Sequence, residues 1–167
     1  MTSSKIEKIN ARLRVRGMDV CPTSEFRQMV PWTRLTFLLC GTGAAIGTAL
    51  QSNVILGAMV PIALYGALMP RHPFDYLYNC VIRRFTGTIE LPKNRAPTRF
   101  ACGIASVWFL TIIAAFSLGC ALTGYALGAV FVAVAALVGT THFCIPGTVY
   151  QFLFGDRRLI KPTLFAK

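Results

Sequence analysis

A long stretch without any charged residue decides the fold, and it runs from Phe100 to Gly155: FACGIASVWFLTIIAAFSLGCALTGYALGAVFVAVAALVGTTHFCIPGTVYQFLFG. A second uncharged stretch, from Leu35 to Met69, precedes it. About 20 apolar residues in a helix cross the hydrocarbon core of a bilayer, because each residue advances the helix by about 1.5 Å. Each stretch is long enough for two such crossings, so the sequence predicts a protein embedded in a membrane.

The composition of the whole chain points the same way. Of its 167 residues, 54% are hydrophobic and only 14% are charged, and the mean hydropathy is +0.58. A water-soluble domain carries about 25% charged residues, so a soluble core is disfavoured. The N-terminal region is polar and lacks the central apolar stretch of a cleavable signal peptide. We therefore expect the chain to insert through its own first helix.

We expect an all-α integral membrane protein with four transmembrane helices arranged as two hairpins. The predicted crossings are about residues 31–50, 54–69, 100–119 and 124–141. A basic arm, residues 1–30, precedes the membrane domain of residues 31–155, and a basic tail of residues 156–167 follows it. The second crossing is short, and Pro61 inside it predicts a kink because proline removes a helical hydrogen bond.

The charged residues determine the expected orientation. The chain has 17 basic and 6 acidic residues, a net charge of +11, and all of them lie in residues 1–34, 70–99 and 156–167. Four crossings place these three segments on one side of the membrane. An excess of Lys and Arg marks the cytoplasmic side, so both termini are expected in the cytoplasm.

A strongly basic soluble protein would suggest a nucleic acid partner, but basic flanks have a simpler role beside membrane helices. Each Lys or Arg near a membrane surface gains about 1 kcal/mol from anionic lipid headgroups. We expect no nucleic acid partner. Anionic headgroups, or another membrane protein, are expected to contact four arginines: Arg83, Arg84, Arg157 and Arg158.

An amphipathic helix is predicted after Pro73, over about residues 74–86. Its apolar residues recur at helical spacing along one side, and polar residues occupy the other side. We expect this helix to lie in the cytoplasmic interface of the membrane, although packing of the apolar stripe on the bundle is compatible with that position. A shorter interfacial helix is predicted after Pro146, over about residues 147–154.

The two hairpins resemble one another. An Ala-Leu-x-Gly segment begins at Ala63 ahead of Pro73, and the same pattern begins at Ala136 ahead of Pro146. Each half would then contain a hairpin, a proline and an interfacial helix. An internal duplication and a chance similarity between apolar hairpins are both compatible with this pattern.

Small residues one helical turn apart predict close packing of helices. Gly-x-x-x-Gly spacings occur at Gly43–Gly47 and at Gly124–Gly128. They favour packing inside the bundle, and the seam of a homo-oligomer is the alternative.

Few residues inside the predicted membrane region offer chemistry. The uncharged stretches contain no Asp, Glu, Lys or Arg. Ion-coupled carriers usually keep an ionisable group at that depth, so a carrier is disfavoured. The six cysteines form no Cys-x-x-Cys pair, so we expect free thiols, and we interpret Cys40 and Cys102 as small hydrophobic residues.

One candidate site is predicted at the cytoplasmic ends of the crossings. It comprises the two histidines of the chain and two cysteines: His72, His142, Cys144 and Cys21. Four such ligands on one face could bind a metal or support thiol redox chemistry. Their spacing matches no standard metal motif, so hydrogen-bonded interfacial histidines are the alternative. The sequence indicates no particular cofactor.

Four short motifs occur in order along residues 21–155: Cys21-Pro22, Arg71-His72-Pro73-Phe74, Ala96-Pro97-Thr98-Arg99-Phe100-Ala101, and Phe143-Cys144 followed by Val149-Tyr150. Together they resemble the bacterial family of small membrane proteins known as domain of unknown function 4395. Many members end in a Phe-Cys-x-x-Cys-x-x-Tyr pattern, whereas this chain has Gly147 at the second cysteine position. The resemblance implies that Cys144 could form a mixed disulfide or pair with Cys21, and it supplies no activity.

The sequence favours a non-catalytic structural or accessory subunit of a bacterial inner-membrane assembly. Uncharged helices, small-residue spacings and a large basic cytoplasmic face suit docking on a partner. The alternative is a thiol-redox or metal-handling membrane protein that uses the cytoplasmic Cys and His residues. A small-molecule channel or carrier is less favoured, because the sequence shows no polar pathway.

Overall fold

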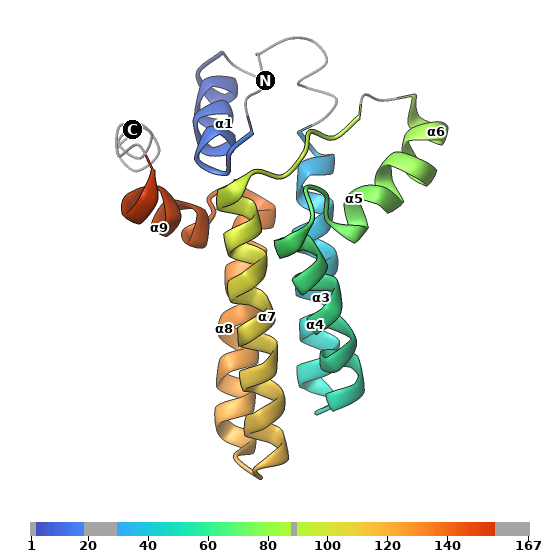
Figure 1. Ribbon diagram of the computed structural model, residues 1–167, viewed down its shortest axis with the longest axis vertical. Coiled ribbons are helices and arrows are strands. Elements are labelled where there is room, and N and C mark those ends of the chain that lie inside the picture. Colours follow the sequence, from blue (N-terminus) through green and yellow to red (C-terminus); the bar gives the residue numbers. More distant parts are fainter. Residues whose placement is uncertain (1–2, 19–29, 88–89, 156–167) are drawn as a thin grey trace.

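The computed structural model describes residues 3–18, 30–87 and 90–155. Within these ranges every regular element is helical and no strand occurs (Figure 1). Four long helices run side by side, and shorter helices gather at one end of the four.

The first pair of long helices is α3 (Leu35–Ala49) and α4 (Asn53–Leu68). A 3-10 turn, η1 (Trp32–Arg34), leads into α3, and the turn of residues 50–52 joins α3 to α4. The bounds agree with the predicted crossings at 31–50 and 54–69 to within a few residues.

The second pair is α7 (Ala96–Ser117) and α8 (Ala121–Thr141), joined by residues 118–120. In Figure 1 this pair extends further than α3 and α4 at the end where both connecting turns lie. The helix α7 starts earlier than the predicted residue 100. Pro97 lies in its first turn, where the fixed φ of proline suits a helix and its missing N–H leaves no bond unmade.

The described helices provide two to three candidate membrane spans. Both α7 and α8 are long and apolar enough to cross a membrane. A third span is possible if α4 and residues Pro73–Thr86, which bend away from it, are counted together as one broken span. By contrast, α3 has 15 residues and α4 has 16, or about 22–24 Å of helix each. The all-helical class is confirmed, while the number of crossings shown is lower than the predicted four.

Each long helix packs mainly against two others: α3 against α4 and α8, and α7 against the same two. The buried core between them consists of Ala44, Leu56, Met59, Ala63, Phe109 and Ile112. Glycines allow the helices to approach one another closely. A Cβ on Gly128 would lie 2.3 Å from Thr48, and a Cβ on Gly47 would lie 2.9 Å from Leu56, so larger residues would not fit there. The Gly-x-x-x-Gly spacings therefore pack helices inside the bundle.

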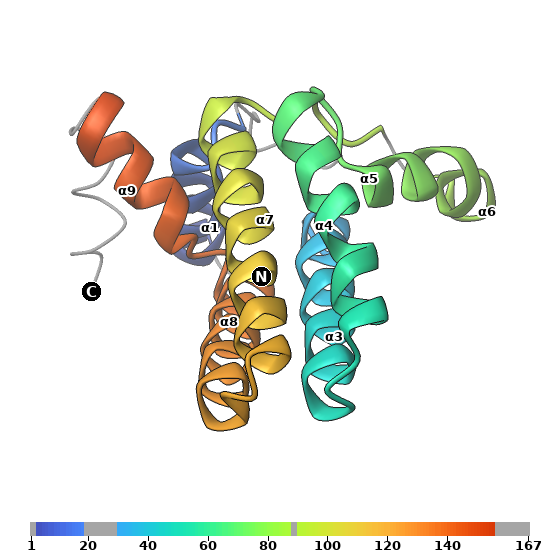
Figure 2. The same ribbon diagram turned by 60° about the horizontal axis from the view of Figure 1, so that its bottom comes forward.

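A bent arm follows α4. It consists of α5 (Pro73–Leu77), a π-turn η2 (Tyr78–Ile82) and α6 (Arg83–Thr86), and it turns by 84° from α4. Figure 2 shows the arm projecting away from the bundle. Tyr78 at its base is fully buried, whereas Phe85 near its tip is 87% exposed. The arm matches the predicted helix of residues 74–86 in extent, with a π-turn that the periodicity did not indicate.

The last described helix, α9 (Ile145–Phe154), projects on the other side of the bundle from the arm (Figure 2). It packs against α7, where the rings of Tyr150 and Phe100 lie 5.5 Å apart. Phe152 and Phe154 are exposed. The helix begins two residues before the predicted position, because Pro146 belongs to its first turn.

The N-terminal segment contains a helix that the sequence analysis missed. The sequence predicts a basic arm over residues 1–30, whereas residues 3–15 form α1 (Ser3–Val15). Ile9 and Leu13, four residues apart, are buried against the end of the bundle, and this spacing was the available signal. Residues 19–29, including Cys21, and the basic tail at 156–167 lie outside the described residues.

The helix α1, the arm and α9 all lie where α4 and α8 finish and where α3 and α7 begin (Figure 1). We call this end of the molecule the polar end.

Candidate functional site

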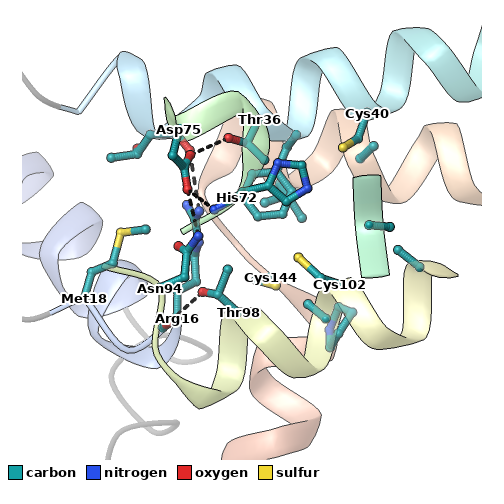
Figure 3. A pocket seen from close by; sticks show the side chains of 18 of the residues that line it. Arg16, Met18, Thr36, Cys40, His72, Asp75, Asn94, Thr98, Cys102 and Cys144 are labelled. Atoms are coloured by element: carbon teal, nitrogen blue, oxygen red, sulfur yellow. Dashed lines mark hydrogen bonds between the residues drawn. The ribbon is translucent and has the colours of Figure 1, made fainter. Parts of the chain in front are cut away.

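A cavity of about 100 Å³ lies among the four long helices at the polar end (Figure 3). Apolar side chains form much of its wall: Phe37, Ala63, Ala105, Phe131, Val134 and Val138. Polar side chains also line it: Arg16, Thr33, Thr36, His72, Asp75, Asn94 and Thr98. Three thiols complete the lining: Cys40, Cys102 and Cys144. The cavity therefore combines an apolar body with polar groups supplied from the polar end.

The buried carboxylate of Asp75 accepts three hydrogen bonds. Oδ1 accepts from the hydroxyl of Thr36 at 2.7 Å, and Oδ2 accepts from the backbone N–H of His72 at 3.0 Å. Oδ2 also accepts from the side-chain amide of Asn94 at 2.7 Å. A buried carboxylate needs such donors to replace its lost water. These three bonds tie together α3, the start of α5 and the loop before α7.

His72 forms the cap of α5. Its Nδ1 accepts a hydrogen bond from the backbone N–H of Phe74 at 3.4 Å, and Asp75 bonds back to the His72 backbone in a capping box. The ring lies against Gly66, where a Cβ would come within 2.3 Å of it. Burial lowers the pKa of His72, and the Asp75 carboxylate opposes this effect only in part. The imidazole is therefore neutral at neutral pH.

His142 ends α8 in the left-handed conformation, with φ of 59°. Its Nε2 accepts a hydrogen bond from Nε of Arg34 at 2.9 Å, and Nδ1 lies 3.5 Å from the hydroxyl of Thr33. Burial, together with Arg34, Arg16 and Arg12, lowers the pKa of His142 to about 4. Both ring nitrogens of this neutral histidine are engaged, as expected of a hydrogen-bonded interfacial residue.

Cys144 caps α9 and is 4% exposed. Burial raises the pKa of this thiol, while Arg16 and the backbone N–H of Gly147 act in the opposite direction. A Cβ on Gly147 would lie 3.3 Å from the Cys144 sulfur, so this glycine occupies the place beside the thiol where a second cysteine side chain would lie. The raised pKa keeps Cys144 protonated and weakens it as a nucleophile.

The predicted Cys/His site is only partly assembled. His72 and Cys144 line the cavity, whereas the ring of His142 is bonded to Arg34 and Thr33. Across the described residues, no three side chains from His, Cys, Asp and Glu are placed to hold a metal ion. Cys21 lies outside those residues. Cys40 and Cys102, which the sequence analysis treated as small hydrophobic residues, prove to line the same cavity.

Arg16 is the residue of this site that sequence reasoning missed. It is 2% exposed, and its guanidinium carbon lies 4.4 Å from the ring centroid of Phe37. Nη2 donates one long hydrogen bond, 3.5 Å, to the carbonyl of Thr33, and the Arg16 carbonyl accepts from the hydroxyl of Thr98 at 2.8 Å. Nε and Nη1 meet no acceptor in the described part of the chain. Burial lowers the pKa of this arginine.

The predicted surface arginines lie away from the cavity. Arg83 and Arg84 are exposed on α6, and Arg83 forms a 3.7 Å ion pair with Glu90. Glu90 also pairs with Arg71. The remaining two predicted contacts, Arg157 and Arg158, fall outside the described residues.

The chain matches the family model described as Domain of unknown function (DUF4395) over residues 30–154. This match confirms the resemblance inferred from the motifs. The matched region includes the four long helices, the arm and α9, but it excludes α1 and Arg16. No curated protein and no solved structure matches the chain significantly.

Replacement of Asp75 by asparagine is expected to lower the free energy of unfolding by about 2–4 kcal/mol, because an amide cannot accept all three buried donors. Glu90→Gln makes the same chemical change at a half-exposed ion pair and should cost under about 1 kcal/mol. Thermal or denaturant unfolding of both variants in detergent measures the difference. Equal effects of the two substitutions would show that the Asp75 network contributes no special stability.

The folded protein should lose stability as the pH falls from about 6.5 toward 4. The pKa of His142 is about 4 in the folded state against an ordinary 6.5, so between these values the unfolded chain binds the extra proton. The lowered pKa of His72 acts in the same direction. His142→Asn, which tolerates the left-handed conformation, should show a smaller fall in unfolding temperature between about pH 7 and pH 5. An unchanged pH profile would contradict this account of His142.

Proposed function

The chain belongs to the DUF4395 family, and we propose that it serves as a non-catalytic structural or accessory subunit of a bacterial inner-membrane assembly. The observation that carries the proposal is the engagement of the reactive groups in structural bonds. Both nitrogens of His142 and both oxygens of Asp75 take part in hydrogen bonds between elements, and Nδ1 of His72 caps a helix. Such groups position the polar end, and they are not poised to exchange protons or bind a substrate atom.

The proposal includes four crossings, since α3 and α4 also expose large apolar side chains. Leu38 and Ile46 of α3 are each 47% exposed, and Leu64 and Leu68 of α4 are 46% and 63% exposed. Outward apolar residues on all sides of a bundle suit contact with lipid rather than water. The short first pair would be accommodated by local thinning of the bilayer or by snorkelling of Arg71.

The polar end is proposed to face the cytoplasm, in keeping with the basic residues that gather there. The arm and α9 would then lie in the plane of the interface, with their apolar residues at the acyl boundary. Phe85 on the arm and Phe154 on α9, 87% and 70% exposed, support this placement. Arg83 and Arg84 would contact anionic headgroups or a partner from the same plane.

Two native cysteines test the topology. Cys80 lies in the arm and Cys120 in the turn between α7 and α8, and both are exposed. A membrane-impermeant maleimide added to intact spheroplasts should label Cys120, and Cys80 should react only after permeabilisation. Cys120→Ser provides the matched control, in which outside labelling disappears. Labelling of both thiols from one side would contradict the crossing by α7, and inverted labelling would overturn the orientation.

If the chain is a subunit, it should co-purify with the other proteins of its assembly. Purification of the full chain from native membranes in mild detergent is expected to yield a complex well above the 18.3 kDa of the single chain, with a co-purifying membrane protein. The replacements Arg83→Ala and Arg84→Ala together should reduce the amount of partner recovered. A monodisperse species of the single-chain mass, with no other protein, would overturn the proposal.

A further inference from the structure

We propose that the cavity at the polar end binds a small organic monoanion, a short-chain carboxylate, through the guanidinium of Arg16. This inference goes beyond the proposed structural role and does not rest on it. It starts from Arg16, which among the described residues is the one strongly basic group of the cavity whose hydrogen bonds are incomplete.

Arg16 lacks acceptors for most of its donors. An arginine carries five N–H groups, and those on Nε and Nη1 are buried without an acceptor among the described residues. Within the part of the chain that the structure describes, the only side-chain hydrogen bond of Arg16 is the long one from Nη2 to the carbonyl of Thr33. Native proteins rarely leave such donors unpaired, because a buried donor without a partner loses its hydration with nothing in return.

Asp75 lines the same cavity but does not neutralise Arg16. Its oxygens are occupied by Thr36, Asn94 and the His72 backbone, and the described ion pairs include none between Asp75 and Arg16. The polar end instead accumulates positive charge. The guanidinium of Arg34 bonds His142, and that of Arg12 donates to the carbonyl of Thr141 at 2.6 Å. Arg16 in the lining, with Arg12 and Arg34 nearby, favours an anion, because the carboxylate of Asp75 already has its donors.

The residues that line the cavity restrict the class of anion that it can bind. Apolar side chains such as Phe37, Phe131 and Val138 surround most of the space, so a ligand with an apolar body fits better than a fully hydrated ion. The nearby Asp75 disfavours a dianion. The volume of about 100 Å³ is smaller than the ~150 Å³ engineered cavity that admits benzene. A carboxylate with a short aliphatic tail meets all three conditions, with its head at Arg16 and its tail between the helices. Figure 3 shows the side chains that would surround it.

Calorimetric titration of the full-length protein in detergent tests the proposal directly. Acetate, propionate and butyrate are titrated at constant ionic strength, with chloride and inorganic phosphate as comparison anions. One saturable site per chain is expected for propionate or butyrate, together with a rise in unfolding temperature of about 4–8 °C near saturation. Absence of a saturable heat, or binding as tight for chloride or phosphate as for the carboxylates, would overturn the proposal.

Arg16→Met should weaken binding, raising Kd by at least tenfold. The variant should still fold, because it replaces an unpaired buried charge with an apolar side chain. Arg14→Met makes the same change at an exposed position of α1 and should leave binding unchanged. Ala101→Leu keeps Arg16 but fills the cavity from α7, so it should also abolish binding. Should Arg16→Met fail to fold, Ala101→Leu decides. Retained binding in either folded variant would overturn the assignment of the site.

Discussion

A carboxylate that is buried needs several donors to replace the water it has lost, and at the polar end this requirement joins three segments that are distant in sequence. Asp75 receives its donors from Thr36 on α3, from the backbone at His72 and from Asn94 before α7. Asn94 in turn donates its backbone N–H to the carbonyl of Pro70. The corner between α4 and α5 is consequently bonded to its neighbours on both sides, and the arm leaves the bundle at a defined angle.

The two ends of the molecule are stabilised by different forces. Between the long helices, packing depends on small residues, as where Gly128 of α8 meets Thr48 of α3. At the polar end, hydrogen bonds between buried polar groups take over, as in the pair formed by Arg34 and His142. In a bilayer this division follows from the solvent, because hydrocarbon provides no drive for apolar surfaces to associate whereas shape and hydrogen bonds still do. The cavity lies between the region held by packing of small residues and the region held by hydrogen bonds.

The sequence predicts the long helices well, because a charge-free stretch leaves few alternatives in a membrane. The predicted bounds of all four differ from the observed ones by only a few residues. The arm and α9 were also predictable, since a proline begins each and an apolar stripe follows. The helix α1 was missed because its basic residues resembled a simple topogenic flank, although Ile9 and Leu13 have helical spacing.

The site was less accessible to sequence reasoning. Arg16 is one of many basic residues, and nothing local distinguishes it from the exposed Arg14. Its burial depends on contacts with Phe37 and Thr98, which lie far along the chain. Cys40 and Cys102 sit in apolar helices, and only the packing of four helices around a common space reveals that their thiols line a cavity.

The long-range bonds of α1 and of Arg16, which follows it, limit when this part of the chain can complete its contacts as it leaves the ribosome. Arg12 donates to Thr141, Arg16 accepts from Thr98, and the carbonyl of Val15 accepts from Gln151 at 3.4 Å. The bond to Thr98 can form once the start of α7 has been synthesised, whereas the bonds to Thr141 and Gln151 need the ends of α8 and α9. The helix α1 is therefore translated first, but its full set of bonds can be completed only after the last described helix. The position of Arg16 beside the cavity thus depends on residues that are synthesised after it.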